Sequence, residues 1–309
     1  MNRRFLFLDV FIIGLIVLVL LVLPFDGTNS VDAEIVSITV LHTNDVHGRV
    51  REEESVAMGY AHIAAKVEEI RSANENVLLL DAGDTFQGSS AAGLYRGEGI
   101  VRIMNSMNYD AMVAGDHDFD YGWQRLWEFA EVTDFPVLSA NVFGSDGIEL
   151  LLPLTIKELN GISIGIFGLT TPETLYKTNP LNVEGLTIID PIEKAQEMVE
   201  ILHDKCDLII ALVHLPLMGT EDSCVSLAEK VKGIDLIVSG HSHVTLEEGM
   251  EINGTYIVQA GEYGGNLGMV DIVLKNKVPA EIKASLYTPV WTEDGLQADE
   301  DVQLIINEM

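Results

Sequence analysis

Short runs of hydrophobic residues recur along the chain, and each is followed by glycine or polar residues. The runs are six to nine residues long and rich in Val, Ile and Leu, which is typical of buried β-strands. We predict strands within residues 35–42, 77–84, 111–116, 162–170, 208–215, 236–243 and 256–264.

Stretches with helical periodicity separate many of these runs. Residues 60–72, 99–108 and 190–205 show this periodicity, and the last of them begins with Asp190 and Pro191, a pair that favours a helix start. Alternation of strands and helices indicates a layered α/β fold. The predicted strands from residue 256 onward follow one another without helices between them, so the sheet is expected to be mixed.

The first 33 residues differ from the rest of the chain. Arg3 and Arg4 precede an uninterrupted hydrophobic stretch over residues 10–23, and a small-residue cleavage site follows at Ala33, which is the pattern of a secretory signal peptide. The alternative is an uncleaved membrane anchor, because the hydrophobic stretch counted from Phe5 approaches the ~20 residues that a span needs. Both interpretations place the rest of the chain outside the cytoplasm, since the arginines hold the N-terminus inside.

The chain is strongly acidic, with 48 Asp and Glu against 18 Lys and Arg and a net charge of −30. This charge argues against binding to nucleic acid, whose phosphates would be repelled, and against contact with anionic lipid. We therefore expect no nucleic-acid partner, and a membrane contact only through the N-terminal segment. A small phosphate substrate would meet the same repulsion, so a site for one should carry metal cations.

The cysteine content is low and does not indicate a thiolate metal site. The two cysteines, Cys206 and Cys224, are not in a CxxC or Cys/His ligand spacing. An exported protein could pair them in a disulfide, and the sequence leaves both the paired and the free state open.

Asp and His side chains follow five of the predicted strands. Ligands in α/β folds bind beyond the carboxyl ends of the strands, so these side chains could meet in one crevice. Asp together with His suits Zn, Mn, Fe or Co. The residues concerned are Asp45, His47, Asp84, Asp116, His117, His214, His241 and His243.

Each of these motifs taken alone could be an ordinary turn or a chance pairing, because Gly and Asp are common in turns. Three other histidines, His42, His62 and His203, are interpreted as structural or surface residues. The metal-site hypothesis depends on the repetition of the pattern at five strand ends.

The order and wording of the motifs resemble a known family. The succession D-x-H, GD-x-x-x-G, G-D-H-D, H and GH-x-H is similar to that of the calcineurin-like metallophosphoesterases. The stretches LHTNDVHG, DAGDTFQGS, GDHDFDYG, LSANV, GHSH and QAGEYGGNLG resemble the 5′-nucleotidase / 2′,3′-cyclic-nucleotide phosphodiesterase branch. The resemblance runs from about Ile38 to Leu274.

The resemblance implies a fold and a division of the chain. The fold would be two facing mixed β-sheets flanked by helices, forming a single catalytic domain over residues 34–290. Residues 1–33 would be the signal peptide or anchor. Residues 291–309 would be a C-terminal tail that begins a linker to a substrate domain.

Carried over motif by motif, the resemblance also implies a site with two divalent metal ions, Zn, Mn, Co, Fe or Mg. One ion would be held by Asp45, His47 and His243, the other by Asp116, His214 and His241, and Asp84 would bridge them. His117 would be the catalytic histidine and Asp120 the acid that orients it, while Asp118 would be a structural turn residue. Such a pair of ions clamps a phosphoryl group and lowers the pKa of water from about 16 toward about 7.

The sequence departs from the family pattern in two respects. Asp116 stands where the family usually has Asn, which adds a negative charge, should strengthen metal binding and should weaken the attraction for phosphate. Nucleotidases of this branch usually continue into a domain that holds the base between aromatic rings, whereas this sequence ends at Met309. The nucleoside pocket is therefore expected to be missing or supplied by a separate chain.

The leading hypothesis is an exported phosphoester hydrolase that acts on nucleotides, either as a 5′-nucleotidase or as a 2′,3′-cyclic phosphodiesterase. The related thiosulfohydrolases stay open as a further possibility. The alternative class is a catalytically weak or inactive accessory subunit with the same fold. Asp116 and the missing domain favour this alternative, whereas His117 and Asp120 argue against it because metal binding alone needs neither.

Overall fold

The computed structural model describes residues 33–289 and 295–309. Glu34–Met309 forms one compact unit, and the account below concerns it. The predicted signal peptide or anchor lies outside the described residues except for Ala33. Among the described residues, no helix combines the length and the hydrophobicity needed to span a membrane.

Two six-stranded sheets form the centre of this unit. The order of the first is β14 (Val278–Tyr287), β13 (Leu267–Lys275), β1 (Ile35–Thr43), β2 (Val77–Asp81), β3 (Ala111–Val113) and β4 (Val137–Leu138). The order of the second is β11 (Met250–Ile252), β12 (Thr255–Val258), β10 (Leu236–Gly240), β9 (Leu208–His214), β7 (Ile162–Thr170) and β6 (Leu154–Leu159). A small ribbon pairs β5 (Val142–Phe143) with β8 (Thr187–Ile188).

Both large sheets are mixed. β1 to β4 run parallel, as do β7, β9, β10 and β12, whereas β13, β14, β6 and β11 join them in antiparallel pairs. The sheets face each other, because side chains from β1, such as Val40, pack in one buried cluster with side chains from β7 and β9, such as Ile164 and Ile210. The predicted architecture of two facing mixed sheets is confirmed.

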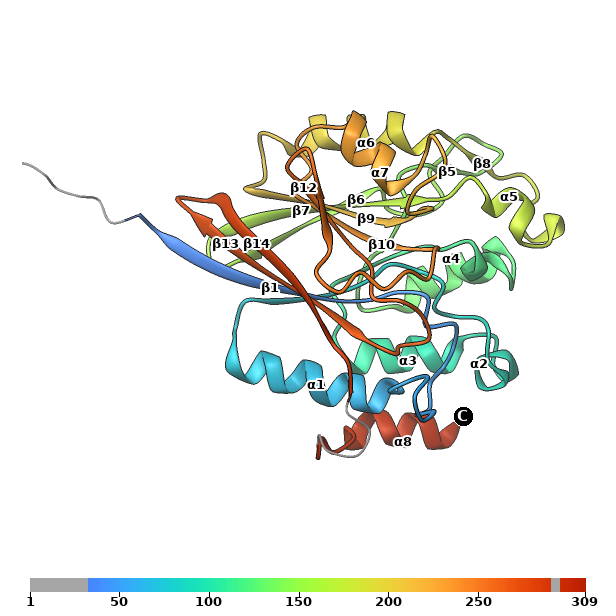
Figure 1. The fold of residues 1–309 in the computed structure, drawn as a ribbon. Coiled ribbons are helices and arrows are strands. Elements are labelled where there is room, and N and C mark those ends of the chain that lie inside the picture. Colours follow the sequence, from blue (N-terminus) through green and yellow to red (C-terminus); the bar gives the residue numbers. More distant parts are fainter. Residues whose placement is uncertain (1–32, 290–294) are drawn as a thin grey trace, which may run out of the picture. The chain divides into compact units, whose positions relative to one another are not determined.

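Helices cover the outer faces of the sandwich (Figure 1). α1 (Tyr60–Ala73), α3 (Glu98–Ser106) and α8 (Glu300–Glu308) pack on the first sheet, and α6 (Pro191–Leu202) and α7 (Cys224–Lys230) pack on the second. Each central strand is therefore buried on both faces, which explains why its sequence reads as a continuous hydrophobic run.

The helices expected near residues 60–72, 99–108 and 190–205 are present as α1, α3 and α6. Most of the strands that carry candidate ligands end before the polar residues of their runs, which lie in the following loops. The expected C-terminal tail contains α8, whose Val302 and Ile306 are buried in the same core cluster as α1 and α3. Hydrophobic periodicity did not single out β13 and β14, which extend the first sheet beyond β1.

Three histidines outside the candidate site and the two cysteines have structural or surface positions. His42 is buried in β1 opposite Gly268 of β13, and burial lowers its pKa to about 4. His62 lies in α1, and His203 follows the last residue of α6. Both cysteines are free thiols.

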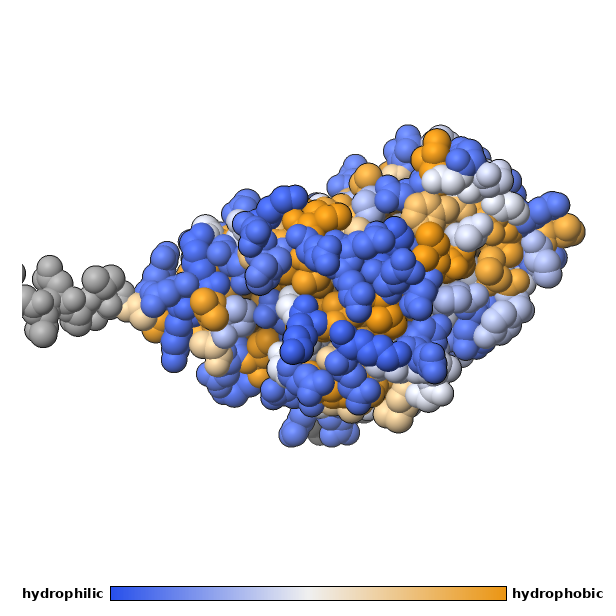
Figure 2. All heavy atoms as spheres, turned by 90° about the horizontal axis from the view of Figure 1, so that it is seen from above, coloured by the Kyte–Doolittle hydropathy of each residue, from blue (hydrophilic) through white to orange (hydrophobic). Residues whose placement is uncertain are grey.

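The surface over α6 and α7 is mainly hydrophilic, as Figure 2 shows. Hydrophobic residues on this face occur in small groups separated by polar ones. This agrees with the acidic composition, because many Asp and Glu side chains are available for the solvent-facing sides of the helices.

Two loops, one after β2 and one after β3, are held together by the buried carboxylate of Asp118. Its Oδ1 accepts the backbone N–H groups of Thr85 and Phe86, at 2.9 and 3.0 Å. Its Oδ2 accepts those of Asp84 and Gly115, both at 2.9 Å. Asp118 is therefore structural, and it fixes the two loops from which Asp84 and Asp116 project.

Replacing Asp118 by Ala should destabilise the fold, because it leaves four buried N–H groups without their acceptor. Each unsatisfied buried group costs about 1–3 kcal/mol, so we expect the free energy of unfolding to fall by about 4 kcal/mol or more. Urea unfolding of the variant measures this. The exposed Asp134→Ala is the control, and a loss no larger than in that control would contradict the assignment.

A second buried carboxylate, Asp81, ends β2. It accepts hydrogen bonds from the hydroxyls of Thr43 and Thr85, both at 2.6 Å, and from the backbone N–H of Gly83 at 3.0 Å. Burial outweighs these bonds and raises the pKa of Asp81 from 3.8 to about 7. The folded protein thus binds this proton more tightly than the unfolded chain, and the associated stability is lost as the pH rises from about 4 to about 7.

In the variant Asp81→Asn the side chain is neutral and does not titrate in this pH range. The stability of the wild type relative to the variant should therefore decrease with rising pH, by up to about 1.4 kcal/mol per pH unit between these limits. Urea unfolding of both proteins across this range measures the difference. A stability difference that stays constant with pH would show that Asp81 does not titrate there.

Candidate metal centre

The candidate ligands gather where the carboxyl ends of the two sheets meet. Each lies at the end of β1, β2, β3, β9 or β10, or within four residues beyond it. Parallel strands in both sheets bring these ends to the same side of the sandwich. The structure thus brings all seven predicted metal ligands together, namely Asp45, His47, Asp84, Asp116, His214, His241 and His243.

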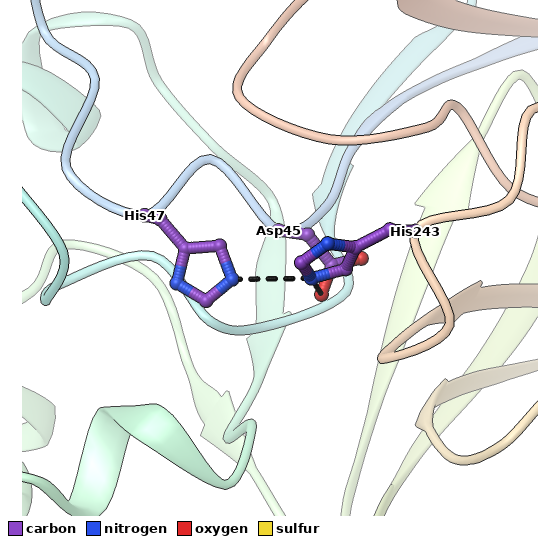
Figure 3. Close-up of side chains that lie close together, drawn as sticks. All are labelled: Asp45, His47 and His243. Carbon is purple, nitrogen blue, oxygen red and sulfur yellow. Dashed lines mark hydrogen bonds and ion pairs between the residues drawn. The ribbon is translucent and has the colours of Figure 1, made fainter.

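The first ligand group consists of Asp45, His47 and His243, whose side chains point toward one another (Figure 3). The Nε2 atoms of the two histidines are 3.2 Å apart, and Nε2 of His243 is 3.4 Å from Oδ1 of Asp45. Asp45 and His47 come from the loop after β1, and His243 from the loop after β10. Their ligand atoms converge as the coordination of one cation requires.

The second ligand group consists of Asp116, His214 and His241. Oδ1 of Asp116 is 2.8 Å from Nδ1 of His241 and 3.1 Å from Nε2 of His214. Burial acts to raise the pKa of Asp116, but the two histidines together outweigh it and hold that pKa well below its usual range. The carboxylate of Asp116 therefore lies against both imidazoles of its group.

Asp84 lies between the two groups. Its Oδ2 is 3.3 Å from Nε2 of His214 in the second group and 3.7 Å from Nε2 of His47 in the first. One carboxylate oxygen is thus within reach of ligand atoms on both sides, which is the position expected of a bridging ligand.

His214 shows that the donor set suits a cation. Its Nδ1–H donates to the carbonyl of Ala82 at 2.7 Å, so Nε2 is the nitrogen that faces the site. That Nε2 is buried, has no partner in hydrogen-bonding geometry, and faces the carboxylates of Asp84 and Asp116. A metal-binding histidine usually has a backbone or carboxylate acceptor on one ring nitrogen, while the other nitrogen faces the metal.

Two glutamates that the sequence analysis did not single out contact the outer nitrogens of ligand histidines. Oε2 of Glu173 is 3.2 Å from Nε2 of His241, and Oε2 of Glu262 is 2.5 Å from Nδ1 of His243. Carboxylates in this position orient the ring and make the ligand nitrogen more basic. Glu262 lies in the QAGEYGGNLG motif, so that motif carried a signal for it, whereas Glu173 had none.

The backbone at the ligands is unusual. Asp45, His47, Asp84, His241 and His243 all have positive φ angles, between 49° and 83°. Such angles are uncommon for residues other than glycine and occur mainly where the surrounding structure enforces them, often at functional sites.

Glycine next to the ligands permits the close packing of their loops. A Cβ atom on Gly83 would lie 2.7 Å from the backbone nitrogen of Gly115 and 2.9 Å from Nδ1 of His214. Any larger residue at Gly83 would therefore push apart the loops after β2 and β3.

The two other predicted site residues, His117 and Asp120, adjoin the second group. Nδ1 of His117 is 2.8 Å from Oδ2 of Asp120, and Nε2 of His117 is 3.8 Å from Oδ2 of Asp116. The hydrogen bond to Asp120 raises the pKa of His117 to about 9; burial opposes this, and Asp84 and Asp116 contribute to it. The imidazole side chain is 36% exposed, so it can meet a substrate from solvent.

Comparison with known proteins identifies the family of this chain. The family model of calcineurin-like phosphoesterases matches residues 38–245. A snake venom 5′-nucleotidase of Naja atra is 34% identical over 306 residues, which cover 88% of this chain and 56% of that protein.

Solved structures resemble the fold as well. The 5′-nucleotidase precursor of Thermus thermophilus superimposes with a TM-score of 0.79 at 29% identity, over 88% of this chain and 58% of that one. The calcineurin-like phosphoesterase YfkN of Bacillus subtilis does so with a TM-score of 0.79 at 27% identity, over 89% of this chain and 97% of that one. The chain spans about half the length of the curated 5′-nucleotidases that it matches. It belongs to the calcineurin-like phosphoesterase family.

Proposed function

We propose that this protein hydrolyses phosphoesters of nucleotides with the help of two divalent metal ions. The observation that carries the proposal is the position of Asp84 between two complete ligand groups, with the His117–Asp120 pair beside them. The names of the relatives support nucleotides as the substrate class.

The residues divide into two sets under this proposal. Asp45, His47 and His243 would hold one ion, Asp116, His214 and His241 the other, and Asp84 both. Bound divalent ions lower the pKa of water and neutralise charge on the phosphoryl oxygens. Their positive charge would also offset the net charge of −30, which otherwise repels a phosphate.

His117 supplies the acid. In its protonated form it donates Nδ1–H to Asp120, and its Nε2–H points toward the second ligand group. A phosphoester bound there would place its leaving oxygen within reach of this proton. Asp120 keeps the imidazole oriented and stabilises its positive charge, as a hydrogen-bonded carboxylate does for a catalytic histidine.

Export is part of the proposal and depends on the N-terminal sequence pattern. The relatives include snake venom proteins, which supports an extracytoplasmic location. Residues that would bind the base or sugar are not identified in the described part of the chain. A separate chain that supplies a substrate domain stays a prediction without support from the relatives, which carry their additional length in one chain.

The alternative, a weakly active or inactive accessory protein, is less well supported. Asp116 favours it, because the extra carboxylate should reduce the attraction for phosphate. The hydrogen-bonded pair of His117 and Asp120 has no use in metal binding alone.

The first experiment combines metal content and turnover. The purified protein, loaded in turn with Mn²⁺, Co²⁺, Zn²⁺ or Mg²⁺, should hold two ions per chain and release phosphate from AMP or hydrolyse 2′,3′-cyclic AMP. His117→Ala should keep the ions and lose about 10²–10⁴-fold in kcat, the usual contribution of a general acid. A metal content of one ion or fewer, or full activity in the variant, would refute the proposal, and two ions without turnover would favour the accessory role.

Asp116→Asn tests the departure from the family. The neutral amide is a weaker ligand, so the affinity for metal should fall. The rate with saturating metal should rise, because one negative charge no longer faces the phosphate. Titration against a chromophoric chelator and kcat at saturating metal measure the two effects, with Asp134→Asn as the surface control. A lower kcat would instead mean that the site is adapted to a carboxylate at this position.

A further inference from the structure

Asp120, the partner of His117, is held from three sides. Its Oδ2 faces Nδ1 of His117 at 2.8 Å, and its Oδ1 accepts the hydroxyl proton of Thr178 at 2.5 Å. Its backbone carbonyl accepts a hydrogen bond from Nδ2 of Asn182 at 2.7 Å. Thr178 and Asn182 lie 58 and 62 residues further along the chain, so tertiary structure alone creates these contacts.

Thr178 is suited to orient a carboxylate. Its side chain is almost fully buried, with 4% of the residue exposed, and its hydroxyl donates to an ionised oxygen, which makes a short and strong hydrogen bond. The bond occupies one carboxylate oxygen and leaves the other turned toward His117. Without it, the carboxylate of Asp120 could rotate about its χ2 angle, which is a soft torsion.

The segment that carries Thr178 is itself fixed at the metal centre. α5 (Thr174–Lys177) begins directly after Glu173, which contacts His241, and ends directly before Thr178. The 3₁₀ helix over Pro180–Asn182 then places Asn182 against Asp120. One short segment therefore contacts both a metal-ligand histidine and the partner of the catalytic histidine.

We propose that Thr178 is a positioning residue that orients Asp120, and through it aims the Nε2–H of His117 at the leaving oxygen of the substrate. This rests on the proposed hydrolase function. In the step concerned, water oxygen forms a bond to phosphorus, and both water protons stay on the phosphate product. The bond from phosphorus to the leaving oxygen breaks, and that oxygen takes the Nε2 proton of His117. The imidazole becomes neutral, while Asp120 stays ionised throughout.

The test compares two substitutions of opposite character. Thr178→Val keeps the shape and removes the hydroxyl, whereas Thr178→Ser keeps the hydroxyl and removes a methyl group. With AMP as substrate, Thr178→Val should lower kcat by about 10- to 100-fold with little change in KM, since misplacing a catalytic group has effects of this size. Thr178→Ser should keep most of the wild-type kcat. A purely structural role would give the reverse order, because a buried cavity penalises Ser, and that order would overturn the proposal.

The choice of substrate sharpens the test. Nitrophenyl phosphate has an acidic leaving group that needs little protonation, so Thr178→Val should affect it much less than AMP. An equal loss on both substrates would overturn the proposal. Thr174→Val is the matched control, because it removes a buried hydroxyl from the same segment that bonds to the carbonyl of Thr171 and not to Asp120.

A measurement without turnover separates this proposal from the hydrolase function. The Nδ1–H proton of His117, assigned by its absence in His117→Gln, should give a downfield NMR signal in the wild type and in Thr178→Ser. In Thr178→Val the signal should shift upfield or disappear by exchange. An unchanged signal in Val would overturn the positioning role. Absence of hydrolysis by the wild type, with the expected NMR changes, would refute only the proposed function.

Discussion

The site depends first on the carboxylate of Asp118, which binds four backbone N–H groups from the loops after β2 and β3. Asp84 and Asp116 project from those loops, and the backbone N–H of His117 donates to Oδ1 of Asp84 at 2.8 Å. A single buried carboxylate thus sets the distances among Asp84, Asp116 and His117. The glycines at 83 and 115 make this close approach possible, because neither carries a side chain.

Electrostatics imposes the second constraint. Asp45, Asp84 and Asp116 are almost completely buried within a few ångströms of one another, in a protein whose net charge is already strongly negative. Buried charges of like sign are costly unless they are paired or coordinate metal. The histidines that face them have their outer nitrogens fixed by Ala82, Glu173 and Glu262, so their lone pairs or protons point inward. Bound cations would neutralise these carboxylates, whereas burying them in an ordinary turn without cations would be unfavourable.

Much of the fold was accessible from sequence because its local signals are strong. The hydrophobic runs that became β1, β2, β7, β9 and β10 are buried on both faces, and the periodic stretches became α1, α3 and α6. The sequence did not predict which strands pair, since the hydrophobic runs resemble one another and do not specify their neighbours in a sheet. The antiparallel partner of β1 is β13, more than two hundred residues away along the chain. Several strands were predicted to be longer than they are, because polar candidate ligands follow the hydrophobic runs without a break.

By itself, the sequence determined which residue types stand at which strand ends, and the resemblance that they carry assigned the ligand groups. Only the tertiary structure decided how these groups meet. It placed the ends of two separate sheets together, enforced positive φ angles at five ligands, and brought Glu173, Glu262 and Thr178 to histidines and an aspartate far away in sequence. These contacts leave little trace in a local pattern, because a carboxylate or hydroxyl that orients a distant side chain is fixed by packing and hydrogen bonds between loops rather than by its sequence neighbours.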